Sequence, residues 1–174
     1  MKWVNHIAIA GSIAAVWKPE LVPVAVLGAT APDWMEWALK TLGQRIKHRT
    51  VTHYVANWFL GLLFGLFIWD FHHAVTAFCA GGLLHVLCDA LTVQGVPLGW
   101  WSDRRFHLFG GRLRTGQMGE YWLAGAVVLA CIGVAVMTRH WSGEYSPFFW
   151  DYPDYYHQGL IDAHEWKENR FRWL

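Results

Sequence analysis

Two side chains in the segment HVLCD have the types and the spacing of a metal site. His85 and Asp89 are four residues apart, so on a helix they share one face, with Cβ atoms about 6 Å apart. An imidazole and a carboxylate placed in this way can bind one metal ion or two neighbouring ions. The same pair could also form a simple hydrogen bond between packed helices, so the pair alone leaves both interpretations open.

Further histidines and acids stand at the ends of other apolar segments. His48 and His53 are five residues apart, which is about 140° around a helix. They cannot share one helical face, so one of them must lie in the loop before the helix, and we expect that loop to bring the two imidazoles towards a shared cation. The predicted metal ligands are His6, Asp33, His48, His53, His85 and Asp89.

Two acids are candidates for catalytic roles. Asp33 is predicted to bridge two ions or to act as a general base, because a carboxylate beside a metal ion can do either. Glu120 is predicted to be a ligand or an acid behind the ligands. Taken alone, Glu120 has a simpler interpretation as a favourable negative charge at the start of a helix.

The composition indicates the elements that must position these side chains. Of the 174 residues, 55% are hydrophobic and 16% are charged, against about 25% charged residues in a soluble domain. A membrane-spanning helix needs about 20 apolar residues. The sequence predicts an all-α, polytopic membrane bundle of about five helices, the first two forming a short or tilted hairpin, from apolar segments at 3–17, 21–39, 54–69, 74–91 and 121–137.

Lysine and arginine residues predict the orientation of this bundle. They gather in the segments 40–53 and 94–119 and are absent from the turn 70–73, so the two basic loops should face the cytoplasm. This puts the N-terminus in the cytoplasm and the predicted metal ligands at the cytoplasmic edge of the bilayer. Residues 1–139 then form a membrane-embedded domain that carries the predicted metal ligands, and 140–174 form an aromatic, acidic tail outside, with an interfacial helix that could bind a partner.

The basic loops also offer groups for a substrate. Guanidinium groups bind phosphate with two parallel hydrogen bonds, although they also meet anionic lipid headgroups in any membrane protein. The net charge of +1 points to no nucleic acid partner. The predicted substrate-binding residues are Arg49, Arg104, Arg105, Arg112 and Arg114.

Four motifs occur in order between the hydrophobic segments: GATAPDW, HRTVTH, HVLCDALTVQGVPLGW and RTGQMGE. Together they resemble the YdjM-like family of inner-membrane-associated proteins regarded as metal-dependent hydrolases, over roughly residues 1–120. The helix with the His-xxx-Asp pair is also similar to zinc-dependent phospholipase C. The resemblance implies a location in the bacterial inner membrane and functional roles for the predicted ligands and Glu120. The family often carries a second acid two residues after the first, where this chain has Met35, with Glu36 beside it.

These observations predict a membrane-embedded metal-dependent hydrolase. Histidine and carboxylate ligands suit one or two Zn²⁺ ions, with Mn²⁺ or Fe²⁺ as alternatives. A site at headgroup depth favours a phosphoester, or an ester, of a lipid or lipid-linked substrate, cleaved by metal-activated water. The alternative is a non-enzymatic bundle that binds a metal or haem or conducts ions. The acids beside the histidines argue against haem.

Overall fold

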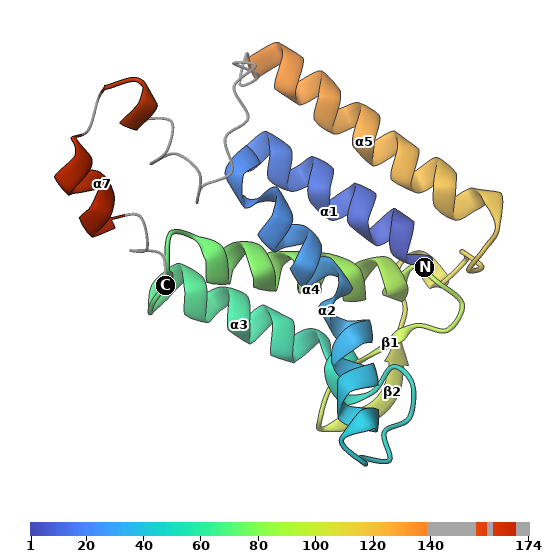
Figure 1. Ribbon diagram of the computed structural model, residues 1–174. Helices are drawn as coiled ribbons and strands as arrows, with labels where there is room; N and C mark the ends of the chain where they lie inside the picture. Colours follow the sequence, from blue (N-terminus) through green and yellow to red (C-terminus); the bar gives the residue numbers. More distant parts are fainter. Residues whose placement is uncertain (139–155, 160–161, 170–174) are drawn as a thin grey trace.

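The structure is a computed structural model that describes residues 1–138, 156–159 and 162–169. Most of these residues are helical, which confirms the helical class predicted from the sequence (Figure 1). The principal helices are α1 (Trp3–Trp17), α2 (Val22–Thr41), α3 (Val55–Phe67), α4 (Ala74–Ala90) and α5 (Met118–Thr138). Short 3₁₀ turns cover Pro19–Leu21, Val51–His53 and Leu108–Gly110, and a short helix α7 covers Ala163–Asn169.

Helix α4 lies at the centre of the bundle, with α2 and α3 packed against it, while α1 packs against α2 and α5 (Figure 1). Small residues allow α2 and α4 to approach closely, as in membrane helix pairs. A Cβ added at Gly28 would lie 2.0 Å from the carbonyl oxygen of Phe78, and one added at Gly81 would lie 2.1 Å from that of Ala25. Backbone therefore meets backbone at this interface, and the relative position of α2 and α4 is narrowly fixed.

Helix lengths separate α5 from the others. Within the described residues, α5, with 21 residues, is the one helix that is both long and apolar enough to cross a membrane. The helices α1, α3 and α4 are apolar but have 15, 13 and 17 residues, short of the usual ~20. Helix α2 has 20 residues and runs on through Pro32. The helices are confirmed close to their predicted places, but five membrane crossings stay a prediction.

The segment 94–119, expected to be a basic loop, contains a small antiparallel hairpin. Strand β1 (Val96–Gly99) pairs with β2 (Ser102–Phe106), with Val96 opposite Phe106. The hairpin lies at the same end of the bundle as the N-terminus (Figure 1). Its strands are too short, and its apolar residues too few, to give a clear alternation in the sequence. The hairpin matters here because Arg105 on β2 donates to the carbonyl oxygen of Arg49, a residue of the candidate site.

The tail predicted at 140–174 lies mostly outside the described residues, and so does the boundary at residue 139. Helix α7 falls within the segment predicted to form an interfacial helix, and the described side chains of Ala163, His164 and Glu165 are exposed. The contact of this helix with a membrane or a partner stays a prediction.

Candidate metal centre

Five of the six predicted ligands come together at the end of the bundle where the N-terminus lies. They form two groups that share one histidine: His6 with His85 and Asp89, and Asp33 with His53 and His85. Within each group the possible ligand atoms lie within 4.8 Å of one another. Helices α1, α2 and α4 and the turn before α3 each contribute to the cluster, so it forms only when the bundle is assembled.

The distances between these atoms suit an ion held among them. His6 Nε2 lies 3.5 Å from Asp89 Oδ1, and His85 Nε2 lies 3.6 Å from Asp89 Oδ2. His53 Nε2 lies 3.3 Å from Asp33 Oδ1. Ligand atoms held tetrahedrally at about 2.1 Å from one Zn²⁺ lie about 3.4 Å apart. The observed separations are close to that value and mostly longer than a good hydrogen bond.

Four buried imidazole nitrogens of the cluster histidines have no hydrogen-bond partner among the described residues. These buried atoms are His6 Nδ1 and Nε2, His53 Nε2 and His85 Nε2. A buried polar atom without a partner is costly, and native proteins rarely leave several together. The unpartnered nitrogens therefore fit a group that accepts lone pairs, and a metal ion is the natural one.

The surroundings of His85 and His53 favour the form of each imidazole that can bind a metal ion. His85 Nδ1 lies 2.6 Å from the carbonyl oxygen of Ala29 on α2. Because a carbonyl can only accept, Nδ1 carries the proton and Nε2 keeps its lone pair. Burial lowers the pKa of His53, which favours the neutral imidazole that a metal ion binds.

The imidazole rings pack against one another in the protein interior. The rings of His6 and His85 are stacked, with centroids 3.8 Å apart and an interplanar angle of 14°. His53 packs edge-on against His85, with centroids 5.4 Å apart. All three side chains are almost completely buried. Such packing limits rotation of the rings and holds the nitrogens in place before any ligand arrives.

Arg49, predicted to bind substrate, lies inside the site rather than on its surface. Its Nη2 is 2.9 Å from Asp89 Oδ1, and its Nη1 donates to Thr92 Oγ1 over 3.1 Å. The Met1 amino group also donates to Asp89 Oδ1. The residue has a φ of 56°, a left-handed conformation that costs energy in a residue with a Cβ. These cations balance the charge of Asp89, whereas Asp33 has no Lys or Arg partner among the described residues.

Glu36 and His48 form a second layer at the edge of the cluster. Both Glu36 carboxylate oxygens lie close to His48 Nδ1, at 3.1 and 3.0 Å, and Lys40 Nζ lies 2.5 Å from Oε1. The rings of His48 and His53 have centroids 5.8 Å apart, so the loop brings them near each other as expected. His48 is exposed and belongs to neither ligand group of the described residues. Glu36 holds the loop through the Arg49 amide, 3.1 Å from Oε2.

The missing family acid has a structural explanation. Met35, which occupies its place, packs against the apolar cluster formed by Ala31, Trp58 and Val86. Two residues after Asp33 is about 200° around the helix, so position 35 faces away from the metal ligands. Glu36, three residues after Asp33, reaches the edge of the cluster, with Oε2 3.9 Å from His53 Nδ1.

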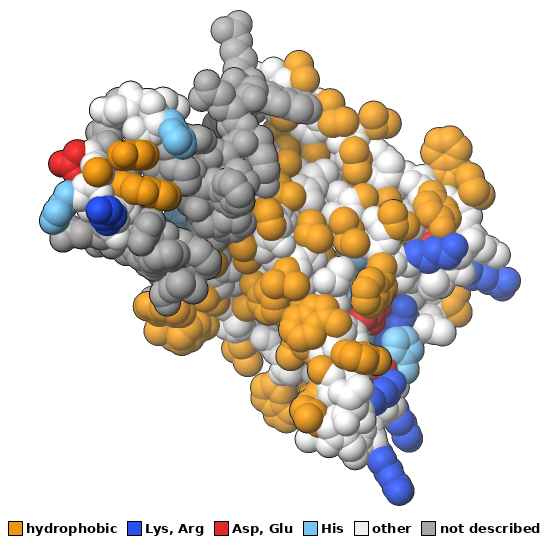
Figure 2. All heavy atoms as spheres, viewed as in Figure 1, with side chains coloured by type: hydrophobic (Ala, Val, Ile, Leu, Met, Phe, Trp, Pro, Cys, Tyr) orange, Lys and Arg blue, Asp and Glu red, His pale blue; other side chains and the backbone are white. Residues whose placement is uncertain are grey.

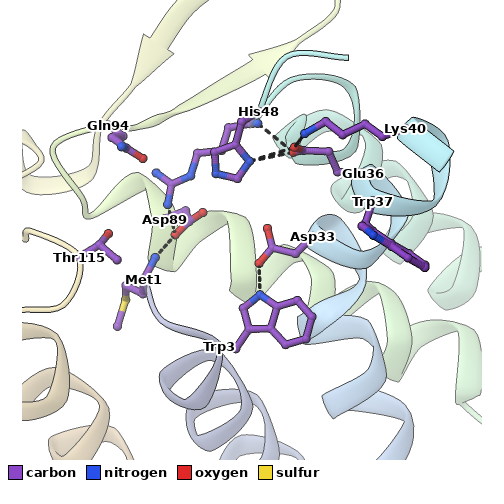
Figure 3. A pocket seen from close by; sticks show the side chains of 11 residues that line it. Met1, Trp3, Asp33, Glu36, Trp37, Lys40, His48, Asp89, Gln94 and Thr115 are labelled. Atoms are coloured by element: carbon purple, nitrogen blue, oxygen red, sulfur yellow. Dashed lines mark hydrogen bonds and ion pairs between the residues drawn. The ribbon is translucent and has the colours of Figure 1, made fainter. Parts of the chain in front are cut away.

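A pocket of about 500 Å³ opens onto this cluster (Figure 3). Of the five predicted substrate-binding arginines, Arg49 is the one that lines it. Arg105 supports the pocket indirectly, because its Nη1 donates to the Arg49 carbonyl oxygen over 2.8 Å. Arg104, Arg112 and Arg114 are exposed and line no part of the pocket. The residues lining the pocket are Met1, Trp3, Asp33, Glu36, Trp37, Lys40, His48, Arg49, Asp89, Gln94 and Thr115.

Glu120 is buried but is not a member of either ligand group of the described residues. Its Oε1 accepts the Gly116 amide over 3.0 Å, and its Oε2 accepts the Lys2 amide over 3.4 Å. This carboxylate therefore ties the loop before α5 to the start of α1. Glu120 also lies in the first turn of α5, which fits its simpler interpretation as a negative charge at the start of a helix.

Replacing Glu120 by glutamine should therefore leave the metal content unchanged. The amide oxygen of Gln can still accept one of the two backbone N–H groups, and we expect a loss of about 1 kcal/mol of stability. Elemental analysis and thermal unfolding of the purified variant would measure both effects. Loss of the metal with the fold intact would return Glu120 to the ligand set.

The fold and the site define a class: helical proteins with a preassembled cluster of histidines and carboxylates at one end of the bundle. A family model described as YdjM inner membrane protein matches residues 1–142, and the chain belongs to this family. The match confirms the family resemblance seen in the motifs and supports a location in the inner membrane. No curated protein and no solved structure matches the chain.

Proposed function

We propose that the protein is a membrane-embedded metal-dependent hydrolase that acts on a phosphoester, or an ester, of a lipid or lipid-linked molecule. The observation that carries the proposal is the set of buried, unpartnered imidazole nitrogens of His6, His53 and His85 beside the carboxylates of Asp33 and Asp89. A bound divalent ion supplies Lewis acidity and lowers the pKa of a water molecule at the site. Zn²⁺ is the preferred ion, with Mn²⁺ and Fe²⁺ as alternatives.

The shared histidine favours one ion over two. His85 Nε2 is 3.6 Å from Asp89 Oδ2 and 3.9 Å from Asp33 Oδ1, so both groups rely on the same nitrogen. Its other nitrogen is committed to the Ala29 carbonyl. One imidazole nitrogen has one lone pair and binds one ion, so only one of the two groups can use His85 as a ligand at a time.

The chain's own side chains have distinct parts in the proposed reaction. Asp33 lines the pocket, and its Oδ2 accepts the indole N–H of Trp3 over 2.5 Å, which fixes the carboxylate orientation. With no Lys or Arg beside it among the described residues, Asp33 suits a ligand or a proton acceptor. Lys40 and Arg49 line the pocket beside their partners Glu36 and Asp89, and their remaining N–H groups would donate to a phosphate.

Haem is the less suitable cofactor for this cluster. The stacked rings of His6 and His85, with centroids 3.8 Å apart, leave no space for a porphyrin between them. Haem proteins with two axial histidines hold these on opposite faces of the macrocycle. The neighbouring carboxylates likewise suit a hydrolytic ion better than haem iron.

The proposed topology follows the distribution of charge. Five crossings would put the N-terminus and the pocket at the cytoplasmic face and residues 140–174 outside, because both basic segments adjoin the pocket end. Lys and Arg side chains gather at that end of the molecule, whereas hydrophobic side chains cover much of the bundle (Figure 2).

Removal of the metal tests the proposed activity. The protein, purified in detergent, would be assayed for headgroup or phosphate release from phosphatidylglycerol and phosphatidic acid before and after treatment with a chelator. We expect release to fall by more than about tenfold and to return when Zn²⁺ is added. Protein that contains no metal as purified and binds none, or release that is unaffected by chelation, would contradict the proposal.

A further inference from the structure

Exposed apolar side chains on α1 and α2 lead directly to the pocket. On α1, Trp3 and Ile7 are 51% and 37% exposed, and on α2, Leu27, Trp34 and Trp37 are 53%, 37% and 69% exposed. These five residues are called the α1–α2 strip. Trp3 and Trp37 also line the pocket, so the strip is continuous with the site.

The spacing of these residues places a pair of them on one face of each helix. Trp3 and Ile7 are four residues apart on α1, and Leu27 and Trp34 are seven apart on α2, so each pair shares a face. The two helices pack against each other, and the Trp34 indole donates to the Leu27 carbonyl oxygen over 3.5 Å. In Figure 2, hydrophobic surface reaches the edge of the charged, histidine-containing patch at the N-terminal end.

Other apolar surfaces of the molecule lack this continuity. Helix α3 exposes Phe59, Leu60 and Phe64, and α5 exposes Trp122, Leu129 and Val136. No residue of α3 or α5 lines the described pocket. These faces suit general contact with lipid tails, whereas the α1–α2 strip joins an apolar surface to a polar cavity.

The polar end of the strip carries groups that suit a phosphate. Lys40 and His48 line the pocket and gather around Glu36 (Figure 3). Arg49 also lines the pocket, with its guanidinium against Asp89. A molecule that contacts both the pocket and the strip must therefore be charged at one end and apolar at the other.

We propose that a single membrane lipid with a phosphate headgroup enters the pocket sideways from the bilayer, with its headgroup at Lys40 and Arg49 and its acyl chain along the α1–α2 strip. This inference rests on the proposed function for the class of substrate and adds its route and its position. Trp3 stands where the two parts meet, because its ring belongs to the strip and its N–H binds Asp33. It is thus a positioning residue for the carboxylate and a wall for the lipid.

Retention of lipid by the purified protein tests the inference. The full chain would be purified in a mild detergent that strips loosely bound lipid, supplied with dioleoyl phosphatidylglycerol, and examined by native mass spectrometry. We expect one phospholipid per chain in the wild type. Trp37→Ala and Leu27→Ala, which remove exposed side chains, should each weaken retention by about tenfold. Trp122→Ala, an equally large change on α5, should leave it unchanged.

Each outcome bears on the inference. Absence of bound phospholipid in the wild type, equal retention in all variants, or an equal loss in Trp122→Ala would overturn it. So would a dimer that Trp37→Ala dissociates without any lipid, since a second copy would then cover the strip. Zinc measured in the same samples separates the two proposals. Lipid retained without metal would support the entry route and contradict the proposed hydrolase. Metal bound without lipid would support the metal site and contradict the entry route.

Discussion

Replacing His85 by alanine is expected to reduce the zinc content of the purified protein from near one ion per chain to below about a tenth. His85 Nε2 belongs to both ligand groups, so its loss leaves neither group complete. Hydrolysis should be lost with the metal. Asp89→Ala should have the same effect and should also leave Arg49 and the Met1 amino group without their buried partner. Elemental analysis of both variants, with circular dichroism to check the fold, gives the answer.

His72→Ala is the matched control for these variants. His72 lies exposed in the turn between α3 and α4. The His72→Ala protein should therefore retain the metal content of the wild type. Unchanged zinc in both His85→Ala and Asp89→Ala would remove these residues from the site and, with them, the basis of the proposed hydrolase.

Gly81→Ala is expected to destabilise the protein and to weaken metal binding together. The new Cβ would lie 2.1 Å from the Ala25 carbonyl oxygen. Because this clash is with the backbone of α2, it can be relieved only if α4 and α2 move apart. Overpacking of this kind costs about 1–3 kcal/mol or more. Moving α4 from α2 would also break the bond from His85 Nδ1 to Ala29, which orients the ligand nitrogen. Thermal unfolding in detergent and zinc titration measure the two effects.

Gly133→Ala provides the control on α5, where an added Cβ would meet nothing within 4 Å. In that position alanine should leave stability unchanged or raise it slightly, because it favours the helix. A Gly81→Ala protein with the stability and zinc affinity of the wild type would show that the α2–α4 contact does not determine the ligand geometry.

The helices were predictable because a long apolar run can form few structures other than a buried or membrane-embedded helix. The segment 3–17 matches α1 at both ends, and 74–91 differs from α4 by one residue. Five of the six predicted ligands also meet in space, since His85 and Asp89 share a helix face and the other segments end at the same depth. The length of α3 was overestimated, because Ile68 and Trp69 are apolar but lie beyond its end.

The contacts that refine the site could not be predicted, because they depend on the path of the loops. Arg49 looked like one of several basic loop residues, yet its left-handed backbone turns it inward to Asp89. His48 and Glu120 had the right residue types, but they bind Glu36 and two backbone amides instead of joining a ligand group. The β1–β2 hairpin was hidden in a segment whose charge was its clearest feature.

The short helices have a consequence for the surrounding bilayer. At 1.5 Å per residue, α3 and α4 extend over only about 20 and 25 Å, whereas the hydrocarbon layer is about 30 Å thick. If both helices cross as proposed, the mismatch draws the lipid surface inward around them. Headgroups next to the protein would then sit deeper than those of the bulk leaflet. The bond that the proposed hydrolase cleaves would thus lie closer to the pocket. The protein would achieve this by deforming the surrounding bilayer, without moving itself.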